Sequence, residues 1–168
     1  MGDITETKII PGDPFHRLEV LLNSFHLVAV QMKDRRKDGK IPRETLTIGD
    51  EYDVQDLLHS LLKIDFNDIR DEEWTPSYAG SAARIDFLLK EEEYAIEVKM
   101  ASDTLRDKVI GKQLIEDIAH YAPHPDCSHL ICFVYDPEYK IKNPQGLVTD
   151  LSKMSTDELT VSVFIRPR

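Results

Sequence analysis

The sequence predicts an α/β domain in which helices flank a mixed central sheet and a helical arm precedes them. Two strand-like runs, residues 84–89 and 94–100, are separated by the charged turn 90–93, which is a hairpin signal. An amphipathic helical pattern over 108–122 leads into the continuous apolar run 130–135, typical of a strand covered on both faces. Strand, helix and buried strand in this order predict a right-handed parallel crossover. An antiparallel hairpin joined to a parallel crossover makes the sheet mixed.

The predicted N-terminal arm begins at Asp13 and Pro14, residue types that favour an N-cap and a first helical turn. Apolar residues then recur at steps of three and four, which predicts a helix from Pro14 to about Lys37. The apolar stripe suits packing on the domain or pairing with a second chain, and it is too short to establish a coiled coil. The charged segment 33–51, with its glycines and proline, indicates a linker with one short extended piece at 46–48.

The chain therefore divides into an N-terminal helix and linker over residues 1–45, an arm for dimerisation or for a partner, and a main domain over residues 46–168. In the main domain Asp53 can cap a helix that ends before Phe66. The apolar face of that helix consists of five residues at helical spacing: Val54, Leu57, Leu58, Leu61 and Leu62.

Three further segments complete the expected order. Residues 71–83 contain a proline and a glycine, which indicates an irregular loop or a broken edge strand. Residues 136–151 are rich in proline, asparagine and glycine and are expected to form turns. The last strand is expected at 160–165.

Composition limits the possible functions. A chain of 168 residues with 41% hydrophobic and 31% charged residues is expected to fold as one soluble domain. The absence of a signal-peptide pattern and of any long apolar run predicts a cytoplasmic protein with no membrane partner. The net charge of −10 disfavours a nucleic-acid binder, because phosphate contacts need clustered lysine and arginine. Lys33, Arg35, Arg36, Lys37 and Lys40 form one such basic cluster, which either meets phosphates or terminates a helix favourably.

The predicted hairpin brings three polar residues together. Glu97 and Lys99 are two apart on one strand and therefore point to the same face. If Leu89 pairs with Tyr94 across the turn, Asp86 lies opposite Glu97, with Cβ atoms about 5 Å apart. Two carboxylates at that distance repel one another unless a cation lies between them, and oxygen ligands favour a hard ion such as magnesium. A structural ion pair between Glu97 and Lys99 is the alternative.

The sequence around these residues resembles that of a known protein family. The run RIDFLLKEEEYAIEVKM resembles the core hairpin of the PD-(D/E)XK nucleases, in which an Asp begins one strand and E-x-K ends the next. The runs EYDVQDLL, EEWTPSYAG and GKQLIEDIAHY are similar to the DpnII/MboI-type branch, which occurs in bacterial restriction and defence proteins. The resemblance extends from Ile48 to the end of the chain and implies a restriction-endonuclease-like core.

The resemblance also implies a function and its partners. It implies a magnesium-dependent endonuclease, able to use manganese, that cuts DNA rather than RNA. The expected substrate is double-stranded DNA, and the expected assembly is a homodimer or a larger defence complex. The alternative is a catalytically inactive module of the same fold that binds a protein partner, which the acidic composition and the short length favour.

The site residues that the resemblance implies are five catalytic positions and one further ligand. Asp86, Glu97 and Val98 are expected to bind the metal, and Lys99 to assist catalysis. Gln55 on the first core helix stands where a glutamate is commoner, and Gln113 lies on the helix after E-x-K, where it is expected to touch water or a phosphate.

Overall fold

The computed structural model of the chain describes residues 12–36, 39, 43–75, 80 and 82–168. Its centre is a five-stranded sheet in the order β1-β2-β3-β4-β5. The first three strands pair antiparallel and the last three parallel, so the predicted mixed sheet is confirmed. The strands are β1 (Ile69–Trp74), β2 (Arg84–Leu89), β3 (Tyr94–Met100), β4 (His129–Tyr135) and β5 (Thr160–Arg166).

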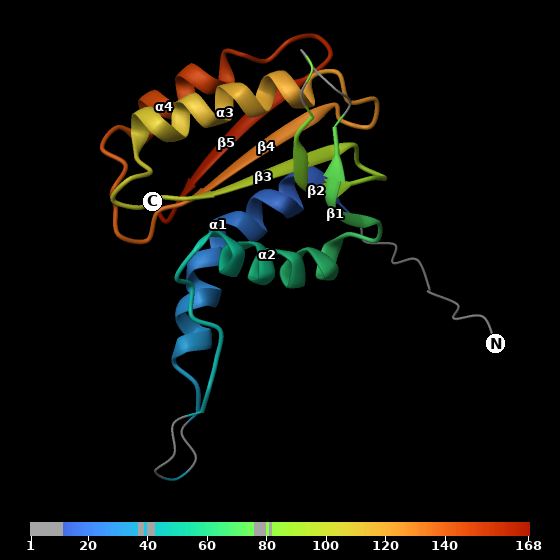
Figure 1. The fold of residues 1–168 in the computed structure, drawn as a ribbon. Helices are drawn as coiled ribbons and strands as arrows, with labels where there is room; N and C mark the ends of the chain where they lie inside the picture. Colours follow the sequence, from blue (N-terminus) through green and yellow to red (C-terminus); the bar gives the residue numbers. More distant parts are fainter. Residues whose placement is uncertain (1–11, 37–38, 40–42, 76–79, 81) are drawn as a thin grey trace, which may run out of the picture.

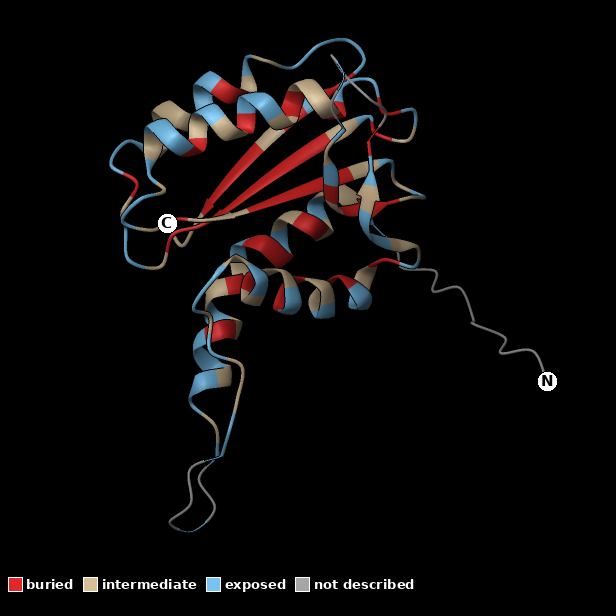
Figure 2. Ribbon diagram, viewed as in Figure 1, coloured by how far each residue is buried: buried red, intermediate tan, exposed pale blue. Residues whose placement is uncertain are grey.

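Two helices cover each face of this sheet (Figure 1). Helices α1 (Pro14–Lys33) and α2 (Glu51–Asp65) lie on one face, and α3 (Asp107–Tyr121) and α4 (Pro144–Ser152) lie on the other. Each pair of helices packs on the sheet to form its own hydrophobic cluster. Because side chains alternate along a strand, neighbouring residues such as Ala95 and Ile96 lie in different clusters. Figure 2 shows β3, β4 and β5 buried along most of their length between these two layers.

Helix α1 is shorter than its pattern predicts. Asp13 caps it, as expected, by accepting a hydrogen bond from the Phe15 N–H. It ends at Lys33, because the apolar stripe stops at Met32 and a run of charged residues follows; position 37 lies outside the described residues. Residues 46–48 form no strand with any described residue, although Leu46 and Ile48 pack against the cluster of α1 and α2.

Helix α2 has the predicted apolar face but a different cap. The N-cap is Asp50, not Asp53. Asp53 occupies the third helical position and completes a capping box, in which each of the two carboxylates accepts a hydrogen bond from the backbone N–H of the other residue. Three extra residues at the start of the helix therefore bring Glu51 into its first turn.

The prediction of turns over 136–151 was wrong from Pro144 onward, where α4 begins. Asn143 is its N-cap and accepts a hydrogen bond from the Gly146 N–H, while Pro144 stands in the first turn. Asn and Pro in that order start a helix as readily as they form a turn. The apolar side of α4, including Leu147 and Leu151, packs toward α3 and the sheet.

Other sequence predictions for this part of the chain are confirmed. β1 forms an edge strand over the first part of residues 71–83, as one alternative expected, and residues 76–79 and 81 lie outside the described residues. The connection from β3 through α3 to β4 is a parallel crossover. No described helix is long and apolar enough to cross a membrane.

Candidate active site

The register of the β2–β3 hairpin matches the count from its turn as far as Phe87, and the ladder does not include the expected pair of Asp86 and Glu97. Leu89 pairs with Tyr94 and Phe87 with Ile96. Beyond that pair a side chain links the two strands in place of a backbone pair. Asp86 Oδ2 accepts a hydrogen bond from the backbone N–H of Val98 at 2.8 Å. Asp86 is thereby fixed against β3 next to Glu97.

Glu97 and Lys99 point together toward α3. Lys99 Nζ donates to Glu97 Oε1 at 2.9 Å, so the ion pair considered from the sequence is present. The other oxygen of Glu97 accepts a hydrogen bond from the Tyr121 hydroxyl on α3. On the same helix, Asp117 Oδ2 lies 3.5 Å from Lys99 Nζ. Glu97 is only 6% exposed, so its charge is held almost entirely by protein groups.

Helix α2 approaches the same place from the opposite layer. Gln55 Nε2 donates to Asp86 Oδ1 at 3.1 Å, and this is the contact that ties the predicted Gln55 to the hairpin. Glu51, one turn earlier on the same helical face, accepts a hydrogen bond from the Met100 N–H at 3.3 Å. One helix from each layer, α2 and α3, therefore meets the hairpin at the carboxyl end of β3.

The carboxylates here resist ionisation. Burial raises the pKa of Glu97 to about 8, with the charges of Asp86 and Asp117 adding to the rise. Burial likewise raises the pKa of Asp86 to about 6. The pKa values of Glu51 and Asp117 are also raised by burial.

One ammonium is shared among these four acids. Burial opposes the charge on Lys99, but Glu97 and Asp117 outweigh it and raise the pKa of Lys99 above its ordinary value. Lys99 in turn lowers the pKa of each of the four carboxyl groups. In an isolated ion pair the two charges cancel. This cluster, by contrast, has more carboxylates than its one lysine can neutralise. It is suited to receive a further cation.

The donor set fits a small hard ion. Among the described residues, no group of three or more histidine, cysteine, aspartate or glutamate side chains is arranged to hold a metal. Magnesium, however, commonly uses one or two carboxylates and keeps several of its waters. The side chain of Val98 is buried on the α1 and α2 side, while its N–H points toward Asp86. Its carbonyl points the same way, as in any strand, and adds a third oxygen.

Gln113 is the predicted residue that does not join the cluster. It is half-buried on α3, one turn before Asp117. Its side chain forms no hydrogen bond with any residue that the structure describes. Its amide therefore remains available for a group from outside the protein.

The sequence interpretation missed Glu51, Asp117 and Tyr121. Glu51 carried a signal, because it precedes Gln55 by four residues and so shares its helical face. Asp117 and Tyr121 carry the same i, i+4 spacing on α3, but Tyr121 reads as an apolar position of that helix. Only the rotation of α3 against the sheet brings its hydroxyl to Glu97.

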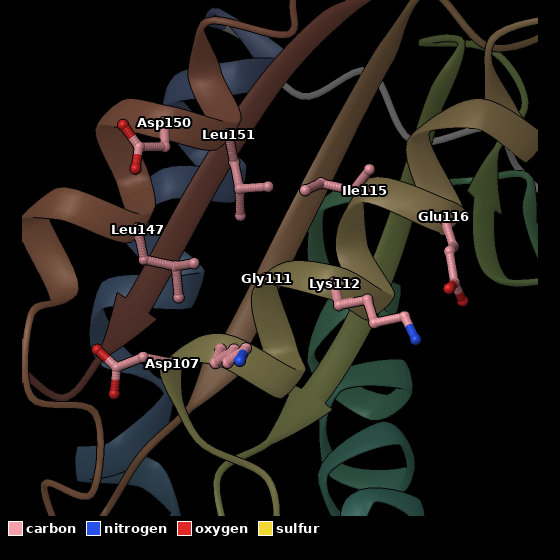
Figure 3. Close-up of a pocket in the computed structure, with 9 residues that line it drawn as sticks. Asp107, Gly111, Lys112, Ile115, Glu116, Leu147, Asp150 and Leu151 are labelled. Atoms are coloured by element: carbon pink, nitrogen blue, oxygen red, sulfur yellow. The ribbon is translucent and has the colours of Figure 1, made fainter.

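A separate groove lies away from this cluster. It has a volume of about 450 Å³ and is lined entirely by α3 and α4, with Ile115, Leu147 and Leu151 among its apolar residues (Figure 3). Gly111 permits the close approach of the two helices, because a Cβ there would lie 3.3 Å from Leu147 Cδ1. Its lining includes none of the residues that the sequence predicted for the site.

Comparison with known proteins gives one result. The family model described as REase_DpnII-MboI, a restriction endonuclease family, matches residues 16–168. No curated protein and no solved structure matches the chain. The match begins in α1 and covers every strand of the sheet.

Proposed function

Because this chain belongs to the DpnII-MboI family of restriction endonucleases, we propose that it is a metal-dependent endonuclease that cuts double-stranded DNA in restriction or defence. The family and the mixed sheet together give it the restriction-endonuclease-like fold. The observation that carries the proposal is the cluster of Asp86, Glu97 and Lys99, in which a half-buried carboxylate, a buried carboxylate and a lysine meet at the end of β3.

In this proposal Asp86, Glu97 and the carbonyl of Val98 hold Mg²⁺, and Mn²⁺ can replace it. A metal ion in such a site polarises a phosphate oxygen and lowers the pKa of a bound water. Gln55 keeps Asp86 oriented through its 3.1 Å hydrogen bond. Tyr121 does the same for Glu97, so both carboxylates are preorganised.

Lys99 is the proposed catalytic cation. Its ammonium stays charged because Glu97 and Asp117 hold it, and its third N–H can donate to a non-bridging phosphate oxygen. Donors fixed where negative charge develops are worth about 100- to 1,000-fold in rate. Gln113, with its free amide, is placed in this proposal at the attacking water or at a neighbouring phosphate.

The test is a cleavage assay on plasmid DNA and on RNA, with Mg²⁺ or Mn²⁺ and with EDTA. We expect cutting of DNA that needs the metal and that is lost in Asp86→Ala and Lys99→Ala. Lys112→Ala is the matched control, because Lys112 is an exposed lysine on α3 at the separate groove (Figure 3). Equal activity of wild type and both site variants on every substrate would refute the proposal.

A second candidate is a non-catalytic module of the same fold that assembles with a protein partner. The net charge of −10 favours it, since an acidic surface repels DNA. Metal binding separates the two: calorimetry should detect Mg²⁺ or Mn²⁺ binding that Glu97→Gln removes if the site is catalytic. A chain that neither binds metal nor cuts would support the assembly role.

A further inference from the structure

Positive charge is unevenly distributed along this acidic chain. Residues 33–43 contain six of its 21 lysines and arginines but only two of its 31 aspartates and glutamates. A short segment with a net charge of +4 therefore stands in a chain whose net charge is −10. Clustered cations of this kind are the electrostatic mark of a surface that meets a polyanion.

The described residues of this basic segment belong to a structural projection. The C-terminal half of α1 leaves the domain, and the chain returns alongside it toward α2 (Figure 1). We call residues 30–36 and 43–46 the basic arm. The Thr45 hydroxyl donates to the Met32 carbonyl at 2.8 Å, and Arg43 Nη1 donates to the Arg36 carbonyl at 3.4 Å. The two limbs of the arm are thus held together.

The cations of the basic arm lack the carboxylate partners that several basic residues elsewhere in the protein have. Seven other basic residues each lie within 4.0 Å of a carboxylate: Arg70, Arg84, Lys90, Lys99, Arg106, Lys140 and Arg168. Lys33, Arg35, Arg36 and Arg43 form no such ion pair with any residue that the structure describes, although Asp34 and Glu44 are their neighbours in sequence. Lys33, Arg36 and Arg43 are exposed to solvent, whereas Arg35 is half-buried.

The base of the arm adjoins the candidate active site. A cavity of about 220 Å³ is lined by Val30 and Lys33 from the arm and by Met100 and Tyr135 at the ends of β3 and β4. Met100 follows Lys99 directly and donates its N–H to Glu51 of the site. The arm therefore begins beside the end of the strand that carries the cluster.

We propose that the basic arm grips the sugar-phosphate backbone of double-stranded DNA beside the cleavage site, and this inference rests on the proposed function. The arm supplies the non-specific affinity that the acidic domain lacks. It carries no base-reading role, because phosphate contacts position a duplex without reporting its sequence.

The test is DNA binding, measured separately from cutting. The full chain is titrated against a fluorescent duplex of about three helical turns, in Ca²⁺ in place of Mg²⁺, between about 50 and 200 mM salt. Lys33→Gln/Arg36→Gln should weaken Kd by about tenfold and reduce the slope of log Kd against log salt by about 2. The matched control is Lys112→Gln/Lys153→Gln, which makes the same charge change on exposed lysines of the α3 and α4 layer.

The outcomes separate this inference from the proposed function. If the wild type cuts DNA and the arm variant has an unchanged salt slope, the DNA-binding role of the basic arm is refuted and the nuclease function is retained. Arm-dependent binding without cutting would support the arm and refute the nuclease. Equal losses in arm and control variants, no binding of DNA at all, or arm-dependent binding to phosphatidylserine vesicles alone would each overturn it. Arg35→Gln/Arg43→Gln repeats the test if thermal melting finds the first variant unfolded.

Discussion

The carboxylate of Asp136 and the carboxylate cluster of Asp86 and Glu97 lie at the carboxyl ends of neighbouring strands, and they are stabilised in opposite ways. After β4, Asp136 is fully buried and accepts hydrogen bonds from the N–H groups of Lys140 and Ile141 and from Arg168. At β3, Glu97 meets the charges of Asp86 and Asp117, and Lys99 contacts Glu97 and Asp117. Asp136 has all the partners that a carboxylate needs. The β3 cluster has too few, which supports the proposal that it is a ligand site and not a structural one.

Replacing a carboxylate by its amide should therefore affect activity and stability in opposite ways at Glu97 and at Asp136. Glu97→Gln is expected to reduce DNA cutting by about 100-fold or more, because a proposed metal ligand is lost. The metal-free protein should be as stable as wild type or more so at pH 8, since repulsion with Asp86 and Asp117 is removed. Plasmid cleavage and thermal melting in EDTA measure both effects. A large fall in melting temperature would mean that Glu97 is structural.

Asp136→Asn should show the reverse pattern. The amide cannot accept three hydrogen bonds as the carboxylate does, and Arg168 loses its partner. We expect a loss of about 2 to 3 kcal/mol in the free energy of unfolding, or roughly 4 to 12 °C in Tm. Cutting per folded molecule should be unchanged. If activity falls while Tm does not, Asp136 does not have the structural role assigned to it.

The free energy of unfolding of the metal-free protein should depend on pH because of the raised pKa values in the β3 cluster. Folding raises the pKa of Asp86 from 3.8 to about 6 and that of Glu97 from 4.5 to about 8. The folded state therefore binds protons more tightly than the unfolded chain does. The resulting stabilisation is present below about pH 4 and is lost as pH rises through 6 and 8.

Magnesium should act in the opposite sense over the same pH window. Its binding requires deprotonated carboxylates, so Mg²⁺ should raise Tm more at pH 8 than at pH 6. Melting curves with and without Mg²⁺ at several pH values measure this difference. An equal rise in Tm at every pH, or none in Glu97-intact protein, would contradict the assignment of the metal to these two carboxylates.

Tyr121→Phe should give the smallest effect. Removing the hydroxyl takes one hydrogen bond from the charged form of Glu97, so the pKa of Glu97 should rise further. We expect roughly a 3- to 10-fold loss of cutting at neutral pH, partly recovered at higher pH. Tyr135→Phe is the control, because its hydroxyl lies 2.8 Å from His26 Nδ1 on the other face of the sheet. A loss that is constant with pH would indicate that Tyr121 only packs.

The sequence predicted those parts of the site that one strand or one turn determines. Alternation places Glu97 and Lys99 on one face, and the four-residue turn sets the position of Asp86. It could not predict contacts that depend on how helices rotate against the sheet, which is why Glu51, Asp117 and Tyr121 were missed. The prediction of turns from Asn143 and Pro144 was wrong because these residue types begin helices as well as turns.

Strand β3 links the chemistry of the protein to its folding. Val98 lies in one hydrophobic cluster while Glu97 and Lys99 point to the other side of the sheet. Deleting a single residue within β3 would exchange these faces and bury two charges among leucines and phenylalanines. The turn 90–93, by contrast, ends at Glu93 with φ 59° and has an exposed Glu91. An engineered insertion, such as an epitope tag, therefore belongs in the turn, whereas length changes in β3 would remove the fold and the site together.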